Sequence, residues 1–166
     1  MVEAETKTKQ VGNKKKETKP TAMSGKRLAV VLVRGTVKVN QKVKDTLLML
    51  RLLHKNHCVV LENNPIVAGM LNKIKDLVTW GEIDDVVLME MAEKKGIEYQ
   101  GRLKDNKEKY NYNKIIEVNG KKYNKMFRLN PPQKGFGRKG VKLPFKLGGA
   151  LGYRGEKMND LIRRML

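Results

Sequence analysis

The fold is decided by a stretch that begins with the apolar run Leu28-Ala29-Val30-Val31-Leu32-Val33 and continues to Ile83. A continuous run of aliphatic, mostly β-branched residues predicts a central strand that is covered on at least one face. A second short strand is expected at Cys58-Val59-Val60-Leu61, and a third at Thr79-Trp80-Gly81-Glu82-Ile83. Residues 26–83 therefore contain three short strands, separated by two longer segments.

Both separating segments have the pattern of amphipathic helices. Asn40 is a good N-cap for a helix from Gln41 to about His54, and Asn64-Pro65 is a strong start for a second helix that runs to Val78. The apolar residues recur three or four positions apart, at Val43, Leu47, Leu50 and Leu53 in the first helix and at Ile66, Met70, Ile74 and Leu77 in the second. The order is thus β-α-β-α-β, and the fold class that it predicts is an α+β sandwich with both helices on one face of a small sheet.

The charge balance predicts a polyanionic partner. The 166 residues include 36 Lys and Arg but 17 Asp and Glu, which leaves a formal net charge of +19. A compact domain with that excess repels itself unless a polyanion neutralises it, so nucleic acid is the expected partner. No apolar run approaches the roughly 18 to 20 residues that span a bilayer, and no signal-peptide pattern precedes Arg27. Because the single cysteine, Cys58, excludes an internal disulfide, we expect a cytoplasmic protein without a membrane partner.

Composition divides the chain into four parts. Residues 1–24 are predicted to form a disordered basic tail, and residues 25–83 the core RNA-binding domain. Residues 84–125 are an insertion with a helix at 84–95 and a hairpin around Asn119-Gly120. Residues 126–166 are a basic, glycine-rich extension with a possible added strand at 126–129 and a C-terminal helix at 156–165. We expect that removal of residues 131–166 leaves the 26–83 core folded.

Three short motifs suggest other chemistry and are judged against their context. The string Gly135-Phe136-Gly137-Arg138-Lys139-Gly140 has the dinucleotide-binding spacing, but prolines flank it where a strand and a helix are required, so we interpret it as a flexible basic loop that lies against phosphates. His54, His57 and Cys58 are too few ligands for structural zinc, so neither a metal nor a cofactor is expected. Arg34-Gly35-Thr36-Val37 is similar to a phosphate-binding loop, but no catalytic set accompanies it.

Trp80, the only tryptophan, has two interpretations that the sequence leaves open. It is either a packing residue of the core or of an edge strand, or a platform on which an RNA base stacks.

Five motifs occur in the same order as in a known family: Leu32-Val33-Arg34-Gly35-Thr36-Val37, residues 46–52, Asn56-His57-Cys58, residues 69–76 and Thr79-Trp80-Gly81-Glu82. They resemble the large-subunit ribosomal protein family that is called L-thirty in bacteria and L-seven in eukaryotes. Residues 128–132 and 148–157 look like the extension of archaeal and eukaryotic members, so the chain is most similar to the archaeal form.

The resemblance implies a β-α-β-α-β fold related to ferredoxin-like sandwiches. It also implies a structural constituent of the large ribosomal subunit that binds and stabilises 23S-type rRNA without catalysis. Members lie near the 5S rRNA side and among other ribosomal proteins, with no small-molecule substrate. Two rivals remain, a free-standing nucleic-acid-binding architectural protein and a small phosphate-ester hydrolase. The candidate RNA-binding residues are Lys26, Arg27, Arg34, Lys38, Lys42, Lys55, Asn56, His57, Lys73, Arg128, Lys134, Arg138, Lys139, Lys142, Lys146 and Arg154.

Overall fold

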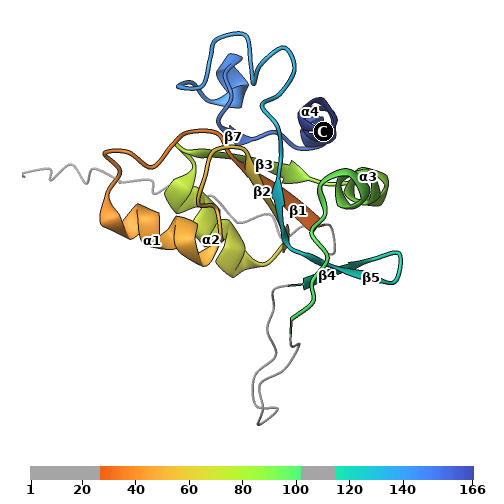
Figure 1. The fold of residues 1–166 in the computed structure, drawn as a ribbon. Helices are drawn as coiled ribbons and strands as arrows, with labels where there is room; N and C mark the ends of the chain where they lie inside the picture. The colour runs from red at the N-terminus through yellow and green to blue at the C-terminus, as the bar shows by residue number, and fades with distance from the viewer. Residues whose placement is uncertain (1–26, 102–114) are drawn as a thin grey trace, which may run out of the picture.

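A five-stranded sheet forms the centre of the molecule in the computed structural model, which describes residues 27–101 and 115–166 (Figure 1). Its strands lie in the order β6-β2-β1-β3-β7, with the bounds β1 Arg27–Leu32, β2 His57–Glu62, β3 Val78–Glu82, β6 Met126–Arg128 and β7 Gly152–Tyr153. β1 is antiparallel to both β2 and β3, β6 is antiparallel to β2, and only β7 runs parallel to its neighbour β3. The α+β class and the central position of the 28–33 run are confirmed.

Helices α1 (Gln41–Met49) and α2 (Pro65–Ile74) cover one face of the sheet together. Val30 and Leu32, which point to this face from β1, pack with Leu47 of α1 and Leu71 of α2. Because successive side chains of a strand point to opposite faces, these residues alternate with Ala29 and Val31. The prediction that both helices lie on one side is confirmed.

Helix α1 ends five residues before the expected His54, at a Schellman motif. Arg51 adopts a left-handed conformation with φ of 60°, the N–H of Leu52 donates to the carbonyl of Leu47 at 2.9 Å, and the N–H of Arg51 donates to that of Leu48 at 2.9 Å. The left-handed position of a Schellman motif is usually occupied by glycine. Because Arg51 occupies it here, the end of α1 could not be predicted from the sequence. It turns Leu52 into the core and leaves Leu53 exposed.

The stripe of α2 is also rotated from the predicted one. Ile66 is 72 % exposed, whereas Leu71 and Ile74 are buried. The helix stops at Ile74 and Val78 already belongs to β3, so Leu77 reaches the core from the connecting turn rather than from the helix.

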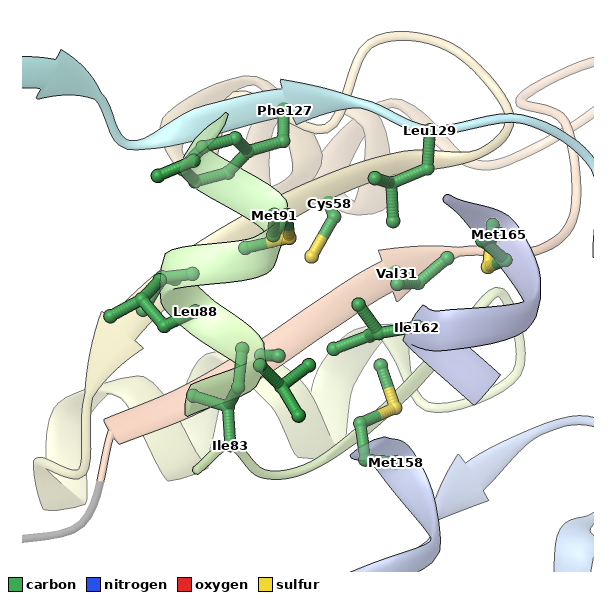
Figure 2. Packing of buried hydrophobic residues seen from close by; sticks show 14 of the residues in the cluster. Val31, Cys58, Ile83, Leu88, Met91, Phe127, Leu129, Met158, Ile162 and Met165 are labelled. Atoms are coloured by element: carbon green, nitrogen blue, oxygen red, sulfur yellow. The ribbon is translucent and has the colours of Figure 1, made fainter. Parts of the chain in front are cut away.

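The second face of the sheet is covered by α3 (Asp85–Lys95) and α4 (Lys157–Met165), as Figure 2 shows. Met158, Leu161, Ile162 and Met165 of α4 are all fully buried, against Val31 of the central strand and Phe127 of β6. Residues 126–166 therefore supply two strands of the sheet, β6 and β7, and one of the two helices of this layer. This packing argues against the expectation that residues 131–166 can be removed from a folded core, because their loss would bring the apolar side chains of this face into water.

The insertion contains the expected hairpin, formed by β4 (Ile115–Val118) and β5 (Lys121–Asn124). Asn119 and Gly120 both have positive φ, 51° and 74°, as a two-residue hairpin turn requires. Predictions for residues 1–24, and for much of the polar segment before the hairpin, lie outside the described residues. None of the helices in the described ranges has the length and hydropathy that a bilayer crossing needs.

Candidate nucleic-acid interface

Three of the candidate cations meet at one end of the sheet, where β1 finishes and β2 begins. The N–H groups of Val33 and Arg34 both donate to the carbonyl of Leu77 at 3.0 Å, which holds Arg34 at this end. Lys55 lies against Gly35, because a Cβ on that glycine would be 3.2 Å from the Lys55 Cε. Arg128 is reached across the sheet, since it pairs with His57 in the β2–β6 ladder. We call this region, together with residues 133–151, the basic end.

Residues 133–151 form a compact loop at the basic end, rather than a flexible one. The N–H groups of Ala150 and Leu151 donate to the carbonyl of Leu143 at 2.9 and 3.1 Å. A Cβ on Gly149 would lie 2.1 Å from that same carbonyl oxygen, and a Cβ on Gly137 would lie 2.6 Å from the carbonyl oxygen of Gly149. These glycines thus permit the backbone to approach itself, and the dinucleotide-binding interpretation finds no support in their surroundings.

Arg154 ties this loop to the sheet. Its side chain donates from Nε to the Thr79 hydroxyl at 2.9 Å and from Nη2 to the carbonyls of Phe136 at 2.7 Å and Ala150 at 3.1 Å. Burial lowers the pKa of Arg154 to about 10, so the guanidinium stays charged at neutral pH. Arg154 was predicted to bind RNA, but only 7 % of its surface is exposed and its Nε and Nη2 are directed to protein oxygens, so we assign it a structural role.

A basic hollow of about 590 Å³ lies between the loop and the outer side of α4. Its charged lining residues are Lys134, Arg138, Arg154, Lys157, Asp160 and Arg164. Phe145 lines it as well, with the Lys157 ammonium 5.9 Å and the Arg154 guanidinium 4.6 Å from its ring centroid. Cations outnumber the single carboxylate, so the hollow suits an anion.

Sequence reasoning missed Phe145, Lys157 and Arg164 as part of this hollow. Arg164 donates from Nη1 to the carbonyl of Gly135 at 2.9 Å and pairs with Asp160 at 3.2 Å. A signal was available, because Lys157, Asp160 and Arg164 recur at helical spacing on the side of α4 opposite to its buried residues.

The remaining candidate cations are exposed but are not all gathered in one place. Lys139, Lys142 and Lys146 lie on the 133–151 loop, and Lys142 lines a smaller hollow of about 240 Å³ with Lys75, the residue that follows α2. Lys38 lies in the β1–α1 connection, Lys42 on α1 and Lys73 on α2. The structure adds no contact that distinguishes these last three from solvated surface residues.

Arg27 lies at the end of the sheet opposite to Arg34. It begins β1, stands across from Glu62 and forms an ion pair with Asp85 at 3.7 Å. Since β1 is six residues long, the two arginines are separated by roughly 20 Å at about 3.3 Å per residue. They therefore do not belong to one surface. Lys26 lies outside the described residues.

Asn56 and His57 form the turn that leads into β2, and they contribute little to the exposed surface. Asn56 has a φ of 64° and its N–H donates to the carbonyl of Leu32 at 2.8 Å. His57 is buried, and burial is the largest cause that lowers its pKa, followed by the charges of His54 and Arg128. His57 is thus neutral at physiological pH and poorly placed to meet a phosphate.

The described residues do not favour metal binding or hydrolysis. Within the ranges 27–101 and 115–166 no three His, Cys, Asp or Glu residues are grouped as metal ligands, and burial raises the pKa of the Cys58 thiol to about 12. The backbone N–H groups of Val33 and Arg34 are already bound to Leu77, so they are not directed at a phosphate as a hydrolase cradle would be.

Comparisons with known proteins agree with this picture. Residues 28–78 match the family model described as ribosomal protein L30p/L7e. The chain is 42 % identical over 152 residues to the large ribosomal subunit protein uL30 of Nanoarchaeum equitans. This alignment covers 83 % of the chain and 97 % of the relative. It is 39 % identical over 149 residues to the protein of the same name from Methanopyrus kandleri, with 81 % and 100 % covered. It is also 42 % identical over 156 residues to the protein of the same name from Methanococcus maripaludis, and the alignment covers 83 % of this chain and 98 % of the relative.

Proposed function

Because the chain belongs to the ribosomal protein L30p/L7e family, in its archaeal-type form, we propose that it is a structural constituent of the large ribosomal subunit. Its role there is to bind and stabilise the 23S-type rRNA without catalysis. The observation that carries the assignment of a binding surface is the basic end, where Arg34, Lys55 and Arg128 share one end of the sheet with the compact loop, which encloses a cationic hollow together with α4.

Binding follows from electrostatics and shape. Phosphates that enter the hollow or lie along the loop replace counterions, and the release of those ions drives association. The loop is held in one conformation by Arg154 and by its own backbone hydrogen bonds, so little conformational entropy is lost when RNA docks. A preformed cationic surface of this kind recognises folded RNA by shape.

The exposed and half-buried cations of the candidate set remain the proposed RNA contacts, apart from Arg27, which pairs with Asp85 at the other end of the sheet, and the hollow adds Lys157 and Arg164 to them. The retained residues are Arg34, Lys38, Lys42, Lys55, Lys73, Arg128, Lys134, Arg138, Lys139, Lys142 and Lys146. We further propose a position on the 5S rRNA side of the subunit, beside other ribosomal proteins, which rests on the family resemblance alone.

The test is sucrose-gradient sedimentation of lysate in low and in moderate salt, with detection of this protein. We expect migration with the large subunit that persists in moderate salt. Replacement of Arg138 and Lys139 by Gln removes two exposed cations of the loop, and each lost phosphate contact lowers the slope of log affinity against log salt by about one.

The matched control is the double replacement of Lys121 and Lys122 by Gln. These residues of β5 are also exposed but pair with Glu98 and Glu117 at 3.8 Å each, so the salt dependence of binding should stay unchanged. Migration near the top of the gradient at every salt concentration would reject the ribosomal role and favour a free nucleic-acid-binding protein. An equal effect of both double variants would reject the basic end as the binding surface.

A further inference from the structure

A third hollow, of about 230 Å³, lies over β1 and β3 on the face of the sheet that α2 covers, and it has different chemistry. Leu28 of β1, Ala68 of α2, and Trp80 and Glu82 of β3 line it, and Tyr153 of β7 closes its edge. The Tyr153 hydroxyl donates to Glu82 Oε1 at 2.6 Å. The side chain of Trp80 is thus a wall of a hollow and not only a packing residue.

The charge of this hollow is opposite to that of the chain. No lysine or arginine is among the described residues that line it, although the chain carries a net charge of +19. Among the lining residues that the structure describes, the ionisable groups are the carboxyl of Glu82, which is 8 % exposed, and the Tyr153 hydroxyl. The hydrogen bond to Glu82 is the main cause that raises the pKa of Tyr153 to about 12, so the phenol stays neutral. A carboxylate in this position repels phosphate and attracts a cation.

Size and lining point to a protein side chain as the occupant. Small-molecule pockets usually measure about 300 to 1,000 Å³, and this hollow is smaller. An aromatic ring beside a partly buried carboxylate is a good receptor for a long cationic side chain, whose methylenes lie on the ring while its head reaches the acid. Tyr and Trp are also enriched among the residues that dominate protein interfaces.

We propose that this hollow is a docking site for a lysine or arginine side chain of a neighbouring protein in the large subunit. The stem of that side chain lies along Leu28 and Trp80, and its charged head binds the Glu82 carboxylate. Asn72 of α2 is exposed at the rim of the hollow. It therefore faces the segment of the neighbouring protein that carries the docked side chain. The proposal rests on the ribosomal role proposed above, and it assigns a protein-facing surface in addition to the RNA-facing one.

The experiment places a photo-cross-linking amino acid at Asn72 in the full chain and irradiates assembled large subunits. We expect an adduct with a protein that survives ribonuclease and whose cross-linked peptide contains Lys or Arg. The fluorescence of Trp80, the only tryptophan, verifies in the purified chain that the variant keeps the surroundings of the hollow.

Two further variants in the cross-linking background test the charge. Ala68→Lys places a cation in the hollow and should lower the yield of the protein adduct by about fivefold or more, because like charges then face each other. Ala68→Gln has a comparable length without the charge and should retain most of the yield. Equal yields from these two variants would overturn the proposal.

The remaining outcomes separate this proposal from the ribosomal role. An adduct that ribonuclease destroys would show an RNA base on Trp80 and overturn the protein-docking proposal, as would the absence of any adduct in subunits that contain the variant. Absence of the wild-type chain from the large subunit would overturn the ribosomal role itself, and the docking proposal with it.

Discussion

At one end of the central sheet Arg34, Lys55 and Arg128 stand together beneath a basic loop, whereas at the other end Arg27 pairs with Asp85 and has Glu62 opposite it. Glu82 and Asp84 lie at this second end too, because Glu82 stands across from Leu28, and Asp84 follows β3 and is held by Asn159 of α4. We call it the acidic end. Arg27 and Arg34 are seven positions apart and look equivalent in the sequence, yet they face opposite electrostatic surroundings.

The ends also differ in construction. The acidic end is held by the Arg27–Asp85 ion pair at 3.7 Å and by the Asn159–Asp84 hydrogen bond at 2.8 Å, both near the surface, and each of these contributes little to stability. The basic end depends on one buried cation, Arg154, and on glycines that allow close backbone approach. A cationic surface can be held rigid in this way, because Arg154 binds protein oxygens from within, while Lys134, Arg138 and Lys139 are exposed toward a polyanion.

The largest effect is expected from Arg154→Met, which breaks the construction of the basic end. The substitution leaves the Phe136 and Ala150 carbonyls without their donor in a buried place, so we expect a loss of about 3 kcal/mol in the free energy of unfolding. Urea unfolding measures it, and hydrogen exchange should show faster opening of residues 133–151. Arg128→Met, at an exposed position, is the control and should change stability by about 0.5 kcal/mol or less. Equal stability of the two variants would contradict the role given to Arg154.

A smaller loss is expected from Gly149→Ala, which tests whether the loop needs its close approach. The new methyl would meet the carbonyl oxygen of Leu143 at 2.1 Å, so we expect destabilisation by more than about 1 kcal/mol, measured by thermal or urea unfolding. The control is Gly69→Ala in α2, where an added Cβ has nothing within 4 Å. That change should stabilise the helix by up to about 1 kcal/mol. The decisive result is that the free energy of unfolding decreases for Gly149→Ala and increases for Gly69→Ala.

The functional difference between the ends is tested with Arg128→Gln and Arg27→Gln. Both residues are exposed arginines at the start or end of a strand. We expect the Arg128 variant to bind an rRNA fragment about tenfold more weakly at low salt, as the loss of about 1.4 kcal/mol implies, and the Arg27 variant to bind nearly as wild type. Filter binding over a series of salt concentrations measures both, and a stronger effect at Arg27 would reverse the assignment of the ends.

The smallest expected effect is a pH dependence that arises at the basic end. The pKa of His57 is lowered in the folded protein from its ordinary 6.5, mainly by burial, so the unfolded state binds a proton more readily. The contribution of His57 to stability is therefore full above about pH 6.5 and is lost as the pH falls from there toward the folded pKa. Urea unfolding between pH 7.5 and 5 should show a decline that His57→Gln reduces. An unchanged decline in the variant would show that other groups cause it.

Several parts of the fold follow from local pattern. The strand at 28–33, the helix start at Asn40, the proline start of α2 and the Asn119-Gly120 turn were all predictable, because each depends on residues a few positions apart. The early end of α1 was not, since Arg51 takes a conformation that glycine usually supplies and only the burial of Leu52 accounts for it. For the RNA-binding surface, the sequence predicted which cations to consider but not which of them lie together in the fold.

The sequence by itself therefore determined the fold class, the two helices on one face, the net charge of +19 and, through collinear motifs, the family. Only the tertiary structure decided that α4 completes the core, that Arg154 is structural, and that Arg27 and Arg34 serve different surfaces. The reason is physical. Periodicity and turn chemistry act over a few residues, whereas burial of a cation, closure of a glycine loop and the gathering of charge depend on residues up to 75 positions apart, such as Thr79 and Arg154.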